Sequence, residues 1–242
     1  NGNSLRSQRT KQSYKSKGYR CPMIIRIGFR TMPSPAFSKF ENRMLTDVDR
    51  LIESHEILSG GAQGRPGLGH ITKSGTFLLC AAWELYIEEL VVEIAKVLAD
   101  RANSPSDLPK EVRKEISKHV KKHSHELKPL DLAGDGWRLV YLAHSKELVS
   151  QLNTPKTGPI NLLVKKISGW TNPTECWSCE PNYINDFVTV RGDIAHRGSD
   201  ANYVRLDTLR DDYRVHIAET VREMDNGACD YVQANSEGNS PW

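Results

Sequence analysis

The chain has 242 residues, 38% of them hydrophobic, which is enough for one large or two small globular domains with a sizeable core. Its formal net charge of +3 is too small to indicate nucleic-acid binding from the overall charge alone. No apolar run approaches the roughly 18 residues that cross a bilayer, no secretory leader is recognisable, and five cysteines, an odd number, indicate no disulfide framework. We therefore expect a cytoplasmic protein with no membrane association.

Residues 1–35 are expected to form a flexible basic arm. The first 21 residues contain basic side chains, no acid and almost no large apolar group, so they cannot bury enough surface to become ordered. The arm could contact a polyanion or act only as a solubilising leader, and its composition fits both roles. A weak alternation of apolar residues at 23–29 also fits a short edge strand.

Helical periodicity dominates the rest of the chain. Apolar residues recur at steps of three and four, and there is no internal repeat and no alternation of strands and helices. The expected helices cover residues 36–59, 70–102, 106–128, 135–152, 184–197 and 204–232. These features predict an all-α fold, a helical bundle of four or more helices over residues 36–234 with an inserted middle section, followed by a flexible tail at 235–242.

The helix predicted over 70–102 has the strongest pattern in the chain. Its first half is apolar on nearly every side, so we expect that half to be buried all round. The glycine-rich segment 60–69 before it is interpreted as a loop, because no strand precedes it and no Gly-Lys-Ser/Thr closes it as in a phosphate-binding loop. Prolines and glycines between 155 and 181 indicate a second, looser section.

The segment VRGDIAHRG, residues 190–198, places an arginine inside the apolar stripe of a predicted helix. On a helical wheel Arg191 falls among the apolar residues, while His196 lies on the flank near the end of the helix. The fold must therefore either supply an acceptor for the guanidinium or leave that part of the stripe open as a cleft. The first candidate acceptor is Glu84, a carboxylate in the apolar half of the helix over 70–102, with Glu88 in reserve. A purely structural interpretation is also open, in which Arg191 and Glu84 form a buried ion pair and His196 interacts with the helix C-terminus.

The chain has an Arg-x4-His motif near the end of a late helix, an earlier helix that contains CAAWELYIEEL, and a long final helix. This arrangement resembles that of the HEPN superfamily (higher eukaryotes and prokaryotes nucleotide-binding). In detail it resembles the branch of stand-alone bacterial domains labelled RiboL-PSP-HEPN or MAE_28990-like, over about residues 36–232. The resemblance implies an all-helical homodimer in which two such motifs line one cleft, a metal-independent endoribonuclease site in many members. It assigns Arg191 and His196 as the catalytic pair and Glu84 as the acid that orients the arginine.

The chemistry of such a site is coherent without a metal ion or a cofactor. RNA carries its own nucleophile, the 2′-hydroxyl, so the site needs a group that transfers protons near neutral pH and a cation for the charge that develops on the phosphorus oxygens. Histidine and arginine supply these two functions, and the expected products carry a 2′,3′-cyclic phosphate and a 5′-hydroxyl. The expected RNA-binding residues are Asp193 and Arg197 beside the motif and Lys118, Lys121 and Lys122 of the basic helix.

Two further groups of residues are interpreted as non-functional. His119, His123 and His125 lie in a basic helix and could hold a metal ion, but without an acidic partner placed on the same face we expect a solvated helix and no metal site. Cys176 and Cys179 form a Cys-x-x-Cys with no second pair and no strand-helix-strand unit beside it, so buried or incidental thiols are expected.

The sequence therefore predicts a HEPN-type metal-independent endoribonuclease in a toxin–antitoxin or phage-defence setting, with RNA as substrate and an antitoxin protein as a possible partner. In active members the position after the arginine is often Asn, Asp or His, and here it is Gly192. The alternative is thus a non-catalytic HEPN module that binds a nucleotide, RNA or a protein partner.

Overall fold

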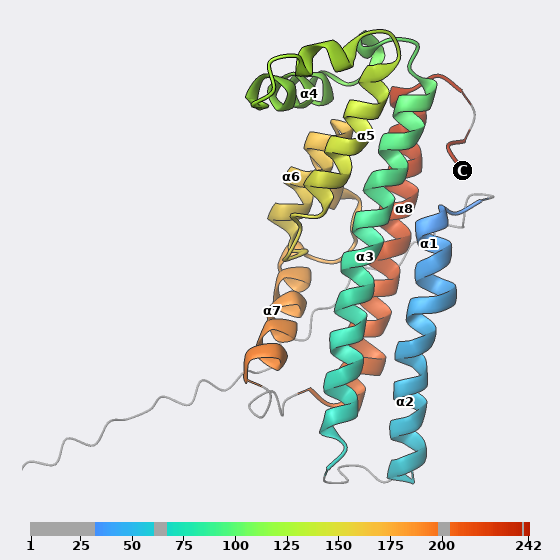
Figure 1. Cartoon of the computed structure of the whole chain (residues 1–242). Helices are drawn as coiled ribbons and strands as arrows, with labels where there is room; N and C mark the ends of the chain where they lie inside the picture. Colours follow the sequence, from blue (N-terminus) through green and yellow to red (C-terminus); the bar gives the residue numbers. More distant parts are fainter. Residues whose placement is uncertain (1–31, 61–66, 198–203, 239) are drawn as a thin grey trace, which may run out of the picture.

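The computed structural model describes residues 32–60, 67–197, 204–238 and 240–242, and every regular element in these ranges is a helix, which confirms the predicted all-α class. The α-helices are α1 (Pro35–Lys39), α2 (Leu45–Ser59), α3 (Gly69–Arg101), α4 (Lys110–Lys122), α5 (Gly136–Val149), α6 (Thr157–Ser168), α7 (Pro181–Arg197) and α8 (Arg214–Asn235). Figure 1 shows an elongated bundle in which α3 runs along almost the whole molecule. Most of the predicted arm, including the possible strand at 23–29, lies outside the described residues.

The first predicted helix is present and contains a π-helical turn. Ser34 caps it, since its hydroxyl accepts a hydrogen bond from the Phe37 backbone N–H at 3.0 Å. Pro35 follows at the first helical position, where its missing N–H is not needed. The π-helical turn η1 (Phe40–Met44) then joins α1 to α2, which ends at Gly60 with a φ of 61°.

Helix α3 forms the centre of the core, and its bounds agree with the prediction to within one residue. Trp83 and Tyr86 on α3 are both fully buried. The Trp83 indole N–H donates to the Pro155 carbonyl and the Tyr86 hydroxyl donates to the Val221 carbonyl, each at 3.0 Å. Because the polar atoms of both large rings are paired, their burial carries no penalty for a lost hydrogen bond, and α3 is tied to the segment before α6 and to α8.

The middle section between α3 and α7 differs from the prediction at α4. This helix ends at Lys122 rather than at 128, because His123 adopts an extended backbone with ψ of 136°. Short 3-10 turns flank α4, namely η2 (Pro105–Asp107) before it and η3 (Lys128–Leu132) after it.

Helix α6 was not predicted at all. It lies in the stretch that was interpreted as loose because of its prolines and glycines. Gly158 and Pro159 fall in its first turn, where a proline interrupts no helical hydrogen bond, and Gly169 with a φ of 86° ends it. Ile160, Val164 and Ile167 then bury one face, so the helix is held by packing despite its start.

The last predicted helix corresponds to the π-helical turn η5 (Thr208–Tyr213) running into α8. The chain after α8, predicted as a flexible tail, contacts α3. The Arg101 guanidinium donates to the Ser236 hydroxyl and to the Ser240 carbonyl, both at 3.1 Å. Figure 1 accordingly places the C-terminus beside the end of the bundle where α3 ends.

Candidate functional site

Arg191 on α7 pairs with Glu84 on α3, as the sequence predicted. The Arg191 Nη2 atom lies 3.5 Å from Glu84 Oε2, and the guanidinium carbon lies 5.4 Å from the centre of the Phe77 ring. Phe77 and Glu84 are two helical turns apart and therefore lie on the same face of α3. The carboxylate and the aromatic ring together hold the guanidinium in place, and Phe77 is a partner that the sequence analysis did not identify.

The pair lies at the rim of the bundle rather than in the core. The side chains of Arg191 and Glu84 are 30% and 17% exposed. The expectation of a core pair is wrong because the neighbouring face of α3 is uncovered in the described structure, with Leu85 36% exposed. Burial raises the pKa of the Glu84 carboxyl, and the nearby Arg191 opposes this shift. The reserve candidate, Glu88, is not the partner that the structure gives Arg191.

Cys80 lies beneath the ion pair and is fully buried. Burial raises the pKa of its thiol to about 12, while Arg191 lowers that pKa and Glu84 raises it. A thiol with such a pKa stays protonated near neutral pH and is a poor nucleophile. Cys80 is therefore not a candidate nucleophile at this site.

His196 is exposed near the C-terminal end of α7, about one and a half turns beyond Arg191. Asp193 is half-buried. Gly192 faces open space, since a Cβ placed there would meet no atom within 4 Å. Helix α7 ends at Arg197, whose side chain lies outside the described residues. Both motif side chains thus reach the surface, and neither is sealed beneath packed neighbours.

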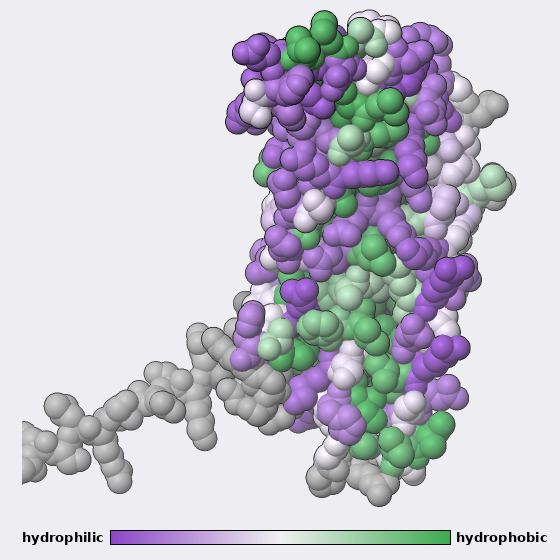
Figure 2. Space-filling view, in the orientation of Figure 1, coloured by the Kyte–Doolittle hydropathy of each residue, from purple (hydrophilic) through white to green (hydrophobic). Residues whose placement is uncertain are grey.

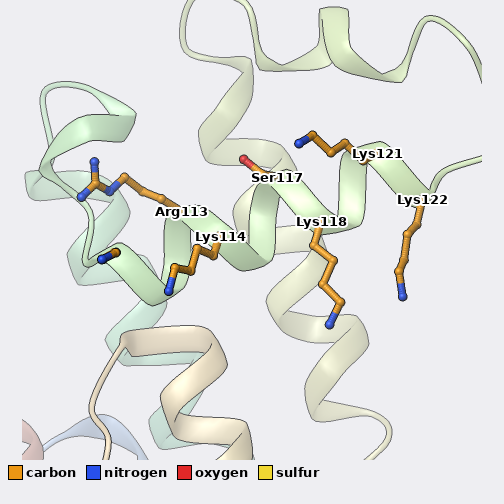
Figure 3. Close-up of a pocket in the computed structure, with 7 residues that line it drawn as sticks. Arg113, Lys114, Ser117, Lys118, Lys121 and Lys122 are labelled. Carbon is orange, nitrogen blue, oxygen red and sulfur yellow. The ribbon is translucent and has the colours of Figure 1, made fainter.

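The predicted RNA-binding lysines of α4 lie elsewhere. They border a shallow basic groove of about 660 Å³, which Figure 3 shows as long side chains extending from one helix. The groove is lined by Lys110, Arg113, Lys114, Ser117, Lys118, Lys121 and Lys122. Glu111 Oε1 lies 2.9 Å from Lys114 Nζ and Glu115 Oε2 lies 3.9 Å from Lys118 Nζ, so two carboxylates neutralise part of this positive charge. Figure 1 shows α4 at one end of the molecule and the C-terminal end of α7 towards the other, so the structure does not bring the two predicted sets of residues together.

A model of the RiboL-PSP-HEPN family matches residues 43–230, a span that includes Glu84, Arg191 and His196. The chain belongs to the RiboL-PSP-HEPN family. No curated protein and no solved structure gives a significant match. Within the described part of this HEPN protein, no helix combines the length and the apolar character that a membrane crossing requires.

The HEPN domain exposes an apolar stripe along the N-terminal half of α3. Phe77, Leu78 and Leu85 are 38%, 42% and 36% exposed, and the exposed Ala81 lies between them. Residues at these spacings lie on one face of a helix. Figure 2 shows hydrophobic surface over this part of the molecule. The expectation that the first half of the helix is buried all round is therefore wrong, because helical periodicity cannot show which faces the rest of the fold covers.

The two groups that were interpreted as non-functional differ in outcome. Cys176 and Cys179 form no disulfide; the Cys176 thiol donates to the Pro173 carbonyl, and burial raises its pKa to about 12. Both cysteines therefore have the properties of structural thiols.

His119, in contrast, has an acidic neighbour, since Glu147 Oε2 of α5 lies 3.7 Å from its Nδ1 atom. The expectation that these histidines have no acidic partner is wrong for His119, whereas His123 and His125 are exposed as expected.

Proposed function

We propose that this HEPN protein is a metal-independent endoribonuclease that cleaves RNA by attack of the 2′-hydroxyl and works as a homodimer in the cytoplasm. The observation that carries the proposal is the fixed guanidinium of Arg191, which Glu84 and Phe77 of α3 hold at the surface. Arg191 lies on the same helix, α7, as the exposed His196. Membership of a family whose domains often act as ribonucleases supports it.

Each residue has a distinct role in the proposed mechanism. Arg191 stabilises the negative charge that develops on the phosphorus oxygens, because a guanidinium offers several donors in a planar fork. Glu84 contacts Arg191 through Nη2, and Nε is buried, so the other terminal nitrogen is the donor that remains for phosphate. His196 acts as general acid or base on the 2′-hydroxyl or on the leaving 5′-oxygen. Glu84 is a positioning residue, since it acts through Arg191.

A homodimer would complete the site. The exposed stripe of Phe77, Leu78, Ala81 and Leu85 lies on α3 beside the Arg191–Glu84 pair. Exposed apolar surface of this kind favours association, and a second copy seated there would bring a second Arg191 and His196 to the same face of the assembly. The twofold arrangement would place the two Arg191–His196 motifs on either side of one cleft that admits a single RNA strand.

The basic helix α4 would add sequence-independent affinity for RNA. Lys118, Lys121 and Lys122 would contact phosphates, and Asp193 and Arg197 would contact RNA next to the catalytic pair. We place the enzyme in a toxin–antitoxin or phage-defence setting, where an antitoxin protein would mask the cleft until it is needed.

Cleavage of RNA in the presence of EDTA tests the proposal. Wild-type protein is expected to cut RNA and to leave DNA of the same sequence intact. His196→Ala and Arg191→Ala are expected to slow cleavage by about 100-fold or more, the loss that follows removal of a positioned proton-transfer group or charge-stabilising donor. His125→Ala, which removes an exposed histidine outside the motif, serves as the matched control and is expected to cut at the wild-type rate.

Two outcomes would reject this mechanism. Cleavage by His196→Ala at the wild-type rate would show that the imidazole takes no part. A wild-type protein that binds RNA without cutting it would favour the non-catalytic HEPN module, the alternative that Gly192 after the motif arginine leaves open.

A further inference from the structure

Four titratable side chains from α4 and α5 meet at the end of the bundle that carries the basic helix. Glu115 and His119 are one turn apart on α4, and His144 and Glu147 are one turn apart on α5. Two approaches join the helices: Glu147 Oε2 lies 3.7 Å from His119 Nδ1, and Glu115 Oε1 lies 3.6 Å from His144 Nε2. One ligand atom each from His119, His144 and Glu147 lie within 4.8 Å of one another.

His144 is the centre of this cluster, and one of its two ring nitrogens has no hydrogen-bond partner. It is 9% exposed, and its Nε2 atom is buried without a hydrogen-bond partner. Its Nδ1 atom lies 3.2 Å from Glu147 Oε2, and its ring stacks on that of His119 with ring centres 4.0 Å apart. A buried polar nitrogen without a partner carries a free-energy cost. That cost would fall if Nε2 carried the proton and Glu115 Oε1, 3.6 Å away, moved within hydrogen-bond distance of it.

We propose that His119, His144 and Glu147 bind one Zn²⁺ ion per chain between α4 and α5. Tetrahedral ligands placed 2.0–2.1 Å from zinc are about 3.4 Å apart. Glu147 Oε2 is 3.2 Å from one imidazole nitrogen and 3.7 Å from the other, so the carboxylate needs little movement, whereas the two stacked imidazole rings must turn so that their nitrogens point to one ion. Imidazole nitrogens with one carboxylate oxygen form a donor set that suits zinc, and three protein ligands leave the fourth position for water.

Glu115 completes the proposed site from outside. When His144 binds the ion through Nδ1, its Nε2 carries the proton and faces Glu115 Oε1 at 3.6 Å. Such a carboxylate behind a ligating imidazole fixes the tautomer and the ring orientation. Burial, together with the neighbouring His144, also lowers the pKa of His119 and so favours the neutral imidazole that a metal ion requires.

The proposed ion would fix the position of the basic helix. Because its ligands come from both α4 and α5, zinc would cross-link these helices and hold the cationic face of α4 at a set angle. The site lies on other elements than the Arg191–Glu84 pair, and it neither requires nor contradicts the proposed ribonuclease activity.

Calorimetric titration of tag-free, EDTA-treated and dialysed protein with ZnCl₂ tests the proposal. We expect one Zn²⁺ per chain and a higher melting temperature in the presence of zinc. His119→Gln and Glu147→Gln are expected to weaken binding by at least about tenfold, and Glu115→Gln by about 10- to 100-fold. The side chains of His119 and Glu147 are 20% and 55% exposed, so both variants should fold, and their melting temperatures without zinc verify this.

His123→Gln is the matched control, because His123 is exposed directly after α4 and its ring centre lies 6.3 Å from that of His119. We expect it to bind zinc as tightly as the wild type. The proposal is overturned if the wild type binds no zinc, if His119→Gln and Glu147→Gln bind as tightly as the wild type, or if His123→Gln loses binding instead.

Discussion

Arg191 stands where the periodicity of α7 favours an apolar residue, and its surroundings explain why it is tolerated. The guanidinium is partly exposed, a carboxylate lies 3.5 Å away and the Phe77 ring lies against it. The partner was predictable, because Glu84 is itself a charge in an apolar helix and needs a donor. The depth of the pair was not predictable, because that depends on which face of α3 the rest of the chain leaves uncovered.

Glu84→Ala measures the strength of this pair. We expect it to lower the free energy of unfolding by about 1–2 kcal/mol, between the values for exposed pairs and for fully buried ones. The control is Asp47→Ala, which removes a pair with Arg50 whose side chains are 62% and 73% exposed, and which should cost less than about 0.5 kcal/mol. If urea denaturation gave the same loss of unfolding free energy for Glu84→Ala and Asp47→Ala, Glu84 would not be paired with Arg191 in solution.

Gly192→Ala is expected to stabilise the protein. The glycine lies within α7 and a Cβ there meets no atom within 4 Å, so alanine should raise the free energy of unfolding by about 0.5–1 kcal/mol. Gly75→Ala provides the contrast within α3, because its Cβ would overlap the fully buried Leu209 side chain and should cost about 1 kcal/mol or more. Destabilisation by Gly192→Ala would show that this position is filled in the assembled protein.

Among the elements, the long periodic helices were predictable and the short ones were not. The bounds of α3 agree with the prediction to within one residue, since its apolar pattern continues over 33 residues. Helix α6 was missed because proline and glycine were taken as loop signals, although in a first turn they are compatible with a helix. The His119 cluster was missed because half of it comes from α5, and sequence spacing within α4 cannot reveal it.

Burial of the Glu93 carboxyl on α3 gives the fold a pH dependence, which the hydrogen bond from α1 opposes. The Glu93 carboxylate accepts a hydrogen bond from the Ala36 backbone N–H at 3.3 Å, and burial raises the pKa of Glu93 from 4.5 to about 7. Between these values the folded protein binds more protons at Glu93 than the unfolded chain does. Stability from this group is therefore full below pH 4.5 and is lost as the pH rises to about 7.

We expect Glu93→Gln to flatten this dependence. Urea denaturation from pH 5 to pH 8 should show a smaller loss of stability in the variant than in the wild type. Some slope remains, because burial also raises the pKa of Asp225, which acts in the same direction. The exposed Glu53→Gln on α2 should behave as the wild type. An unchanged slope in Glu93→Gln would mean that the carboxyl titrates normally in the folded state.

At the scale of the whole molecule, the exposed stripe on α3 indicates that one chain does not bury all of its apolar surface. We predict that Leu78→Lys converts a dimer into a monomer in light-scattering measurements and also abolishes RNA cleavage, with little change in the melting temperature of the monomer. Leu139→Lys on α5 is the control, since Leu139 is 74% exposed and lies outside the stripe. A Leu78→Lys variant that stays dimeric would place the subunit interface elsewhere.

The most direct measurement of the central claim is an analysis of the RNA ends that the protein produces in EDTA. Attack by the 2′-hydroxyl, assisted by His196 and Arg191, predicts 2′,3′-cyclic phosphate and 5′-hydroxyl ends that disappear with His196→Ala. Ends bearing a 5′-phosphate and a 3′-hydroxyl, or any cleavage that persists unchanged in His196→Ala, would contradict the account.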